Sequence, residues 1–338
     1  MSDKQTSFRP AIGLVGAGRF GLALSQVVAR NGHRTVLYTS LPERAAALST
    51  TRRLPDVLPE LEELDARVEV TNDPHFLAEH CGLILVTVSS EYFLPILKTL
   101  GSVLDGAHAV VHAVHQVHGK NLTRVTELIG EHSCVRQVGV IAGPTHVREL
   151  LLGLPNAAVV GSAFPGVIRA TRRALDGETM RVYGNEDVTG VELAAAMGQV
   201  VALATGIADG LDLGAATHAT LMTRGFRELA LLGVQQKNAR ESTFAGLAGF
   251  GRLIDTIRRG EPNYQFGLDL VKTPDVVTMV KGALPEVQAI PVVNSLAEYS
   301  AWHGYELPIA GGLQRVLRGE IDLRSAVTSW MRLEELYE

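Results

Sequence analysis

The stretch Ile12–Gly21 constrains the fold more than any other part of this chain. It is an apolar run that leads into three glycines with the spacing G-x-G-x-x-G, and a helical pattern follows directly. In this context Gly16 permits a tight turn, Gly18 lets the backbone approach a pyrophosphate, and Gly21 lets helix and strand pack closely. The N-terminus of the helix would offer free N–H groups to phosphates. The pattern therefore predicts a strand–turn–helix unit that binds a dinucleotide.

Length and composition indicate a globular protein of two domains. The 338 residues exceed the usual size of a single core, and 46% of them are hydrophobic. A net charge of −5 argues against a sequence-independent nucleic-acid binder. The two cysteines, Cys81 and Cys134, lie far apart in apolar sequence and form neither a disulfide framework nor a zinc pattern, as is typical of a reducing cytosol. We expect a cytoplasmic protein with no signal peptide, no membrane span and no nucleic-acid partner.

Strands and helices alternate in the first half of the chain. Continuous runs rich in Val and Ile are typical of strands buried on both faces of a parallel sheet. They predict an α/β Rossmann domain, doubly wound with a mostly parallel sheet, over residues 11–185, after a flexible tail at residues 1–10. The expected strands are Ala11–Val15, Arg34–Thr39, Arg67–Thr71, Leu83–Val88, Ala109–Val114, Val138–Ala142 and Ala157–Gly161, and the expected helices are Gly18–Asn31 and Leu41–Thr50.

The second half predicts an all-α substrate domain over residues 186–338. Thr189 and Glu192 have the spacing of a capping box, and the Ala-rich stretch that follows to Ala208 is apolar on nearly every face, as in a helix buried in a core. Further helices are expected over Leu221–Val234, Ser242–Ile257, Val287–Ser300 and Ile309–Arg318.

Segments along nearly the whole chain resemble the NAD(P)-dependent glycerol-3-phosphate dehydrogenase family. Besides the glycine turn they include Ala142-Gly-Pro-Thr145, Asp187-Val-Thr-Gly-Val-Glu-Leu193, Thr223-Arg-Gly225 and Thr243-Phe-Ala-Gly-Leu-Ala-Gly249. The resemblance implies a Rossmann domain, a helical domain and an active site in the cleft between them. It also implies reduction of dihydroxyacetone phosphate by a nicotinamide hydride, assisted by two lysines.

Both lysine positions differ in this chain. The first is His115, followed by Gln116, and the second is Gly198, followed by Gln199. An ammonium group stabilises a developing alkoxide and can deliver a proton, and Gly198 can do neither. Loss of one such group typically lowers turnover by about 10²–10³. A shifted alignment would offer Lys120 in place of His115.

Three further positions depart from the family. Arg252 stands where an aspartate is expected, Pro262 replaces an arginine beside the retained Asn263, and Lys281 replaces a glutamate. A guanidinium holds phosphate with two parallel hydrogen bonds, and proline has no such donor. This chain therefore lacks several groups that the family uses for its ordinary reaction.

His115 is the expected catalytic acid or base, because histidine titrates near neutral pH; the alternative is a neutral residue that fills a vacated position. By resemblance His146 and His218 also border the cleft, but no ligand spacing supports a metal and we expect none. The residues His108, His112 and His118 are interpreted as packing or surface residues, and Glu149 and Glu192 as structural. Expected substrate contacts are Gly143, Thr145, Arg252, Thr256 and Asn263, and expected cofactor contacts are Gly16, Ala17, Gly18, Arg19, Phe20, Gly21, Thr39, Ser89, His115, Val147 and Lys281.

The residues after the second strand bear on cofactor choice. A Rossmann domain that prefers NAD usually carries an acid about 20 residues beyond the glycines, to bind the ribose 2′-OH. This chain has Tyr38-Thr39-Ser40 there, with Arg44 soon after. The missing acid favours NADP over NAD.

The sequence is compatible with two classes of function. The first is an NAD(P)-dependent oxidoreductase that transfers a hydride between nicotinamide and a small carbonyl or alcohol, phosphorylated or not, with a non-standard active site. The alternative is a catalytically inactive or repurposed homologue that binds the dinucleotide as a sensor or complex partner. A homodimer is compatible with either.

Overall fold

The computed structural model describes residues 10–283 and 287–332, and their contacts form two compact units. One unit contains the chain up to Val114 together with Val125–Val191, and the other contains His115–Arg124 together with the chain from Glu192 onward. We call them the Rossmann unit and the helical unit. The expected tail at residues 1–10 lies outside the described residues except for Pro10. The sequence predicted a single boundary near residue 185. The structure instead divides the chain after Val191 and assigns residues 115–124 to the helical unit.

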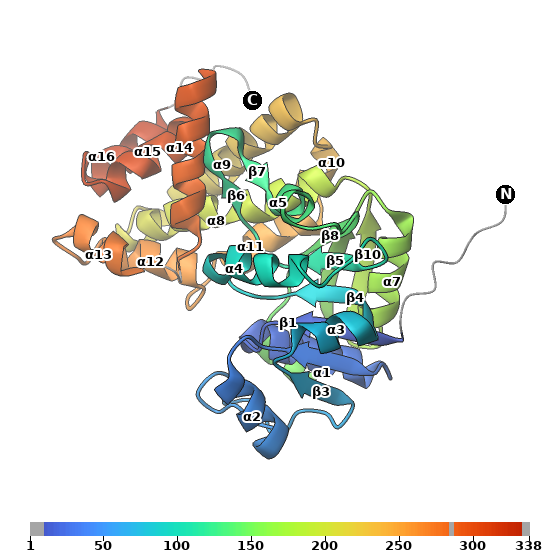
Figure 1. Ribbon diagram of the computed structural model, residues 1–338. Helices are drawn as coiled ribbons and strands as arrows, with labels where there is room; N and C mark the ends of the chain where they lie inside the picture. The colour runs from blue at the N-terminus through green and yellow to red at the C-terminus, as the bar shows by residue number, and fades with distance from the viewer. Residues whose placement is uncertain (1–9, 284–286, 333–338) are drawn as a thin grey trace. The chain divides into compact units, whose positions relative to one another are not determined.

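The Rossmann unit is built on one eight-stranded sheet with the order β10-β9-β8-β5-β4-β1-β2-β3 (Figure 1). Every neighbouring pair is parallel except β8 and β9, which are antiparallel. The predicted mostly parallel sheet is confirmed, and β10 is a strand that was not expected. The strands are β1 (Ala11–Val15), β2 (Thr35–Tyr38), β3 (Val68–Thr71), β4 (Cys81–Val86), β5 (Ala109–His112), β8 (Gln137–Ala142), β9 (Asn156–Gly161) and β10 (Met180–Asn185).

Helices cover both faces of this sheet, because its strands are apolar on both sides. One face packs against α1, α6 and α7 in a core that includes Leu22, Ile141 and Leu175. The other packs against α3, α4 and α5 in a core that includes Leu77 and Phe93. This doubly wound arrangement confirms the predicted fold class. The helices are α1 (Arg19–Arg30), α2 (Pro42–Thr51), α3 (Pro74–His80), α4 (Ser90–Gly101), α5 (Val125–His132), α6 (Val147–Leu152) and α7 (Pro165–Leu175).

The helical unit is organised around α8 (Val188–Gly210). This helix is long and apolar enough to cross a membrane, but the whole of its apolar window is buried, as in the core helix of a globular domain. Its neighbours pack Leu232, Leu296 and Leu313 into the same core. They are α9 (Gly214–Lys237), α10 (Glu241–Ala245), η2 (Leu247–Gly251), α11 (Arg252–Thr256), α12 (Pro262–Leu270), α13 (Val276–Ala283), α14 (Ala289–His303), α15 (Pro308–Leu317) and α16 (Leu323–Met331).

Two local predictions for this half are wrong. The cap of α8 is Asp187, whose Oδ1 accepts a hydrogen bond from the Gly190 N–H at 2.9 Å, so the helix begins before the proposed Thr189 cap. The single helix expected over Ser242–Ile257 is three short pieces, because the chain leaves helical geometry at Gly246, where φ is −90° and ψ is −167°. A Cβ at Gly249 would lie 2.1 Å from the Phe244 carbonyl oxygen, so this tight path depends on glycine.

A short excursion between β5 and α5 belongs to the helical unit. It consists of β6 (Val117–His118), η1 (Gly119–Asn121) and β7 (Thr123–Arg124), and β6 pairs with β7 as an antiparallel ribbon. Ser295 on α14 fixes it, because its Oγ donates to the Val117 carbonyl at 3.0 Å and accepts from the Gly119 N–H at 3.1 Å. These bonds explain why the excursion packs with helices rather than with the sheet.

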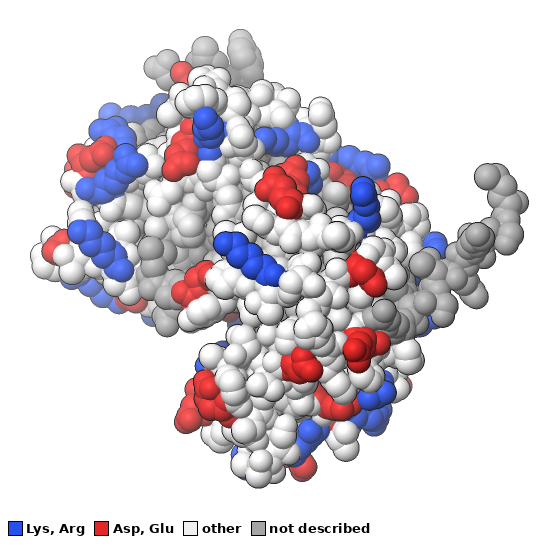
Figure 2. Space-filling view, in the orientation of Figure 1, with Lys and Arg blue, Asp and Glu red and all other residues white. Residues whose placement is uncertain are grey.

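Acidic and basic side chains are interspersed over the face drawn in Figure 2. This agrees with the near balance of 31 Lys and Arg against 36 Asp and Glu in the whole sequence. On that face, among the described residues, neither sign of charge forms a broad continuous surface.

Candidate functional site

The glycine turn between β1 and α1 has the geometry that its sequence predicts. Gly16 has a φ of +111°, which favours glycine, and a Cβ at Gly21 would lie 1.9 Å from the Gly16 carbonyl oxygen. At Gly18, by contrast, no heavy atom beyond its chain neighbours lies within 4 Å of the position a Cβ would take. The backbone is therefore open to solvent where a pyrophosphate would approach, and the residues present fit a dinucleotide.

The turn lies at the edge of the sheet where several expected contacts gather. Because β1, β2, β4, β5 and β8 run parallel, their carboxyl ends meet at one edge, and β1 lies at the point where strand order reverses. Thr39 follows β2, Ser89 precedes α4 after β4, and Gly143 follows β8 with a φ of +133°. Thr145 lies in the same β8–α6 connection as Gly143, and Val147 begins α6.

Two of the side chains near this edge have partners that reduce their freedom to reach a ligand. The Arg19 guanidinium forms an ion pair with Glu60 at 3.1 Å and donates to the Val57 carbonyl at 3.3 Å. Thr39 is buried, and its Oγ1 accepts from the Leu41 N–H at 3.3 Å. The Ala17 and Phe20 positions belong to the turn and the start of α1.

In the helical unit, His115 lies next to α8 and is held there through its backbone. The Gln199 Nε2 donates to the His115 carbonyl oxygen at 2.8 Å, and both residues are buried. Gln116 donates through its Nε2 to the Gln288 carbonyl at 3.0 Å, which anchors the next residue to the chain before α14. The His115 carbonyl is thus held by α8, and the residue that follows it is held by the chain before α14.

Gln199 is a further candidate residue at this position, and it was not predicted from the sequence. It is one of the few polar side chains in a helix that is otherwise apolar, and its exposed fraction is 2%. Its Oε1 is buried and has no hydrogen-bond partner among the described residues. The signal in the sequence was an amide in the middle of a buried apolar helix, since such a group needs a partner.

Gly198, the residue before it, is buried on α8 but has room for a Cβ. The nearest heavy atom to a Cβ built there is the Leu253 Cα at 4.0 Å. Packing therefore does not require a glycine at this position. Arg252 precedes Leu253 in the sequence and begins α11. Burial lowers the pKa of the Arg252 guanidinium, and the charges of Asp255 and Glu261 oppose this shift.

Thr256 and Asn263, two expected substrate contacts, already have structural partners. The Thr256 Oγ1 donates to the Leu253 carbonyl at 3.0 Å. The Asn263 Oδ1 accepts from the Ala289 N–H at 2.8 Å, at the start of α14. The Asn263 side chain therefore has its two amide N–H donors and one lone pair of its oxygen left for a ligand.

Two lysines considered for the site, Lys120 and Lys281, lie in the helical unit. The Lys120 Nζ lies 3.3 Å from the centroid of the Trp302 ring, in a cation–π contact. Lys281 is exposed on α13. Lys120 is thus directed to a surface tryptophan, which gives no support to the shifted alignment.

The remaining histidines and acids are mainly structural. His108 is buried, with its Nε2 2.9 Å from the Ala78 carbonyl, and burial lowers the pKa of His118. His146 precedes α6 at its N-cap position. Glu192 is 2% exposed and pairs with Arg124 at 3.3 Å, in agreement with the structural interpretation. Among residues 10–283 and 287–332, no group of three or more His, Cys, Asp or Glu is placed to hold a metal ion.

His218 and Cys134 differ from their expected surroundings. His218 lies in a pocket of the helical unit, where its Nδ1 is 2.8 Å from the Asp209 Oδ2. Cys134 is exposed rather than in apolar surroundings, whereas Cys81 is buried. Cys81 and Cys134, both within the described residues, are not joined by a disulfide.

Comparison with known proteins covers nearly the whole chain. Residues 11–166 match the family described as NAD-dependent glycerol-3-phosphate dehydrogenase N-terminus, and residues 187–328 match its C-terminus. A glycerol-3-phosphate dehydrogenase of Thioalkalivibrio sulfidiphilus, named as using NAD(P)+, is 33% identical over 315 residues, which cover 91% of this chain and 93% of that protein. The corresponding enzyme of Moorella thermoacetica is also 33% identical, over 91% of this chain and 92% of its own length.

Solved structures agree. The glycerol-3-phosphate dehydrogenase of Coxiella burnetii superposes with a TM-score of 0.87 and 25% identity, covering 96% of this chain and 99% of that one. That of Plasmodium falciparum gives a TM-score of 0.88 at 15% identity, with 98% and 97% of the two chains covered, and shows the same fold. This chain belongs to the NAD-dependent glycerol-3-phosphate dehydrogenase family and is an NAD(P)-dependent oxidoreductase.

Proposed function

We propose that this chain transfers a hydride between the nicotinamide of NAD(P) and a small phosphorylated carbonyl or alcohol, with His115 in place of the usual lysine as the acid or base. The observation that carries the proposal is the contact between Gln199 and His115. An amide buried in the core helix holds the His115 backbone at 2.8 Å, and the residue before that amide is Gly198, where packing leaves room for a Cβ. Relatives named glycerol-3-phosphate dehydrogenase support a phosphorylated substrate.

The residues of the helical unit suggest how the reaction would proceed. When bound, the reduced nicotinamide supplies the hydride to the carbonyl carbon. The His115 imidazolium would then give a proton to the carbonyl oxygen as negative charge develops there. Arg252 would attract the substrate phosphate through its guanidinium. The Gln199 Oε1 is a buried acceptor that a substrate hydroxyl could fill.

NADP is proposed as the preferred cofactor. The residues after β2 include no acid until Glu43, in the first turn of α2, which leaves room for a 2′-phosphate beside Arg44. The test is to measure the dissociation constants of NADPH and NADH by fluorescence titration. NADPH should bind more tightly by about tenfold, and Arg44→Gln should remove most of that difference. Equal affinities for the two cofactors would contradict the preference.

Binding without turnover is the second candidate. It is favoured by Gly198, which has no side chain to stabilise an oxyanion, and it corresponds to a sensor or a subunit of a complex. Tight NADPH binding with no oxidation across a panel of phosphorylated and unphosphorylated carbonyl compounds would support it.

The decisive experiment follows nicotinamide absorbance with NADPH and dihydroxyacetone phosphate, and then with the carbonyl panel. His115→Ala should lower any turnover by about 10² or more while leaving the affinity for NADPH largely unchanged. Gly198→Lys should raise turnover of dihydroxyacetone phosphate, because it restores an ammonium group at a position on α8 where packing leaves room for a Cβ, and Gly198→Met is the matched control without charge. An unaffected rate in His115→Ala would remove His115 from the mechanism.

The cellular setting is also a proposal. We infer a cytoplasmic homodimer that has neither a nucleic-acid nor a membrane partner, in keeping with the acidic net charge of −5 and with the burial of α8. Cell fractionation and analytical ultracentrifugation would test the two parts separately. Recovery in the membrane fraction, or a monomer at high protein concentration, would contradict them.

A further inference from the structure

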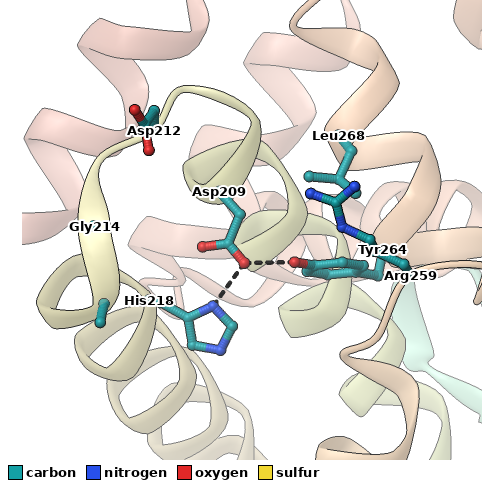
Figure 3. A pocket seen from close by; sticks show the side chains of 8 residues that line it. Asp209, Asp212, Gly214, His218, Arg259, Tyr264 and Leu268 are labelled. Atoms are coloured by element: carbon teal, nitrogen blue, oxygen red, sulfur yellow. Dashed lines mark hydrogen bonds and ion pairs between the residues drawn. The ribbon is translucent and has the colours of Figure 1, made fainter.

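The pocket that contains His218 lies entirely within the helical unit. It has a volume of about 400 Å³ and is lined by Asp209, Asp212, Gly214, Ala215, His218, Arg259, Tyr264 and Leu268 (Figure 3). None of these residues is among those assigned above to hydride transfer. Its walls are the end of α8, the turn to α9, the first turns of α9, the chain before α12, and α12 itself.

Close packing of α8 on α12 builds this pocket. A Cβ at Gly206 would lie 2.3 Å from the Tyr264 carbonyl oxygen, and one at Gly267 would lie 2.5 Å from the Leu203 carbonyl oxygen. The backbones of α8 and α12 therefore approach each other closely at Gly206 and Gly267. This approach brings the Tyr264 side chain to Asp209, less than one turn further along α8.

Asp209 is held in one orientation by two donors. Its Oδ2 accepts from the Tyr264 hydroxyl at 2.5 Å and lies 2.8 Å from the His218 Nδ1, as the dashed lines in Figure 3 show. Burial and this bond raise the pKa of Tyr264 to about 12, so its hydroxyl remains a donor to the carboxylate at neutral pH. The second carboxylate oxygen, Oδ1, is left for a ligand, since no described residue hydrogen-bonds to it.

The charges of the pocket are separated into two poles. Asp209 and Asp212 lie toward the α8–α9 turn, whereas Arg259 lies on the side of Tyr264 and Leu268 (Figure 3). Within residues 10–283 and 287–332, neither Asp212 nor Arg259 forms an ion pair with another side chain. A carboxylate pole and a guanidinium pole on opposite sides of a small cavity match a ligand with both signs of charge.

We propose that this pocket binds a small zwitterion, a molecule with a primary ammonium group and an anionic group a few bonds apart. The ammonium would donate to Asp209 Oδ1 and to Asp212, and the anionic group would accept from Arg259 and, when the ring is protonated, from the His218 Nε2. The anionic group is a carboxylate, as in an α-amino acid, or a phosphate monoester, as in an aminoalkyl phosphate. The inference concerns binding alone and does not depend on the proposed hydride transfer.

Four probes of similar size test the proposal by calorimetric titration of the full chain. L-alanine and phosphoethanolamine carry both charges, propionate carries only the negative charge, and propylamine only the positive one. At least one zwitterion should bind, about tenfold or more tightly than either singly charged probe. The zwitterion that binds identifies the anionic group.

Variants of the two exposed poles then locate the site. Asp212→Asn and Arg259→Gln should each weaken binding of that zwitterion by about tenfold. Asp56→Asn and Arg53→Gln, exposed positions of the Rossmann unit, are the matched controls and should have no effect. Asp209→Asn is a poorer test because it breaks the bonds to His218 and Tyr264, so circular dichroism must first show that it folds. The proposal is overturned if no zwitterion binds, if singly charged probes bind equally well, or if the pole variants bind as the wild type does.

Discussion

Gly21 and Gly198 are both helical glycines, and their surroundings are opposite. A Cβ at Gly21 would lie 1.9 Å from the Gly16 carbonyl oxygen, whereas a Cβ at Gly198 would have no neighbour nearer than 4.0 Å. The first glycine is required by backbone geometry, and that geometry is the cofactor turn itself. The second is not required by packing, and we propose that its missing side chain reflects the chemistry of the site. Dinucleotide binding and catalytic equipment are therefore specified by different physical constraints in this chain.

The largest effect is expected from Gly21→Ala. The new methyl group overlaps backbone and the Thr87 side chain, so we expect a loss of about 3 kcal/mol of stability together with loss of NADPH binding. Gly18→Ala is the matched control, because its methyl group enters open space: the fold should keep its stability while NADPH binds more weakly. Urea unfolding and fluorescence titration measure the two quantities. Equal stability of the two variants would show that Gly21 is not sterically required.

The electrostatic cost of burying Glu228 in the helical unit can be compared with the steric cost of a side chain at Gly21. The Glu228 carboxylate accepts from the Ile309 and Ala310 N–H groups at 2.8 and 3.1 Å, but burial raises its pKa to about 7. A raised acid pKa means that the folded state binds the proton more tightly, so stability falls as pH rises from about 4.5 to about 7. Glu228→Gln should remove up to about 3 kcal/mol of this pH dependence.

Thermal unfolding of the Glu228→Gln variant at pH 5 and pH 8, beside the wild type, measures this effect. Glu306→Gln serves as an exposed control on the same unit. If the wild type and Glu228→Gln lose the same stability between the two pH values, the assignment to Glu228 is wrong.

Two glycines of α8 test the comparison within one helix. Gly206→Ala should destabilise by about 2 kcal/mol, because its methyl group meets the Tyr264 backbone at 2.3 Å. Gly198→Ala should instead stabilise by up to about 1 kcal/mol, since alanine is the better helix former and nothing obstructs it. Chemical denaturation of both variants shows whether each one gains or loses free energy of unfolding. A loss of stability in Gly198→Ala would mean that packing, and not chemistry, requires that glycine.

The smallest effect concerns the start of the same helix. Asp187→Ala should cost about 1 kcal/mol, because it removes the acceptor of the Gly190 N–H. Thr189→Ala, at the position that the sequence pattern suggested as the cap, should cost only a few tenths of a kcal/mol. Thermal unfolding compares the two variants, and a larger loss at Thr189 would restore the capping box.

The fold was predictable because its signals are local. The glycine spacing and the Val-rich runs predict the Rossmann topology, and those strands lie within a few residues of their expected bounds. The breaks at Gly246 and the cap at Asp187 were missed because several glycines and several short polar residues compete within one turn, and only tertiary packing selects among them.

The candidate site was less predictable than the fold. The resemblance to the family indicates that His115 and Gly198 replace its lysines. It does not indicate that Gln199 contacts His115, because the two residues are far apart in the sequence and meet only when residues 115–124 pack with the helices. The pocket around Asp209 was missed for the same reason. Its three hydrogen-bonded groups come from α8, α9 and α12, which no short motif connects.

The packing of residues 115–124 with the helices has a consequence for how the molecule can be divided. The polypeptide passes between the two units three times, after Val114, after Arg124 and after Val191. A C-terminal fragment that begins at Glu192 would lack the ribbon that satisfies Ser295, and it would leave Glu192 buried without Arg124. Proteolysis at a single bond near residue 191 should therefore release a C-terminal fragment that is not stable by itself, because the helical unit also needs residues 115–124 from the N-terminal fragment.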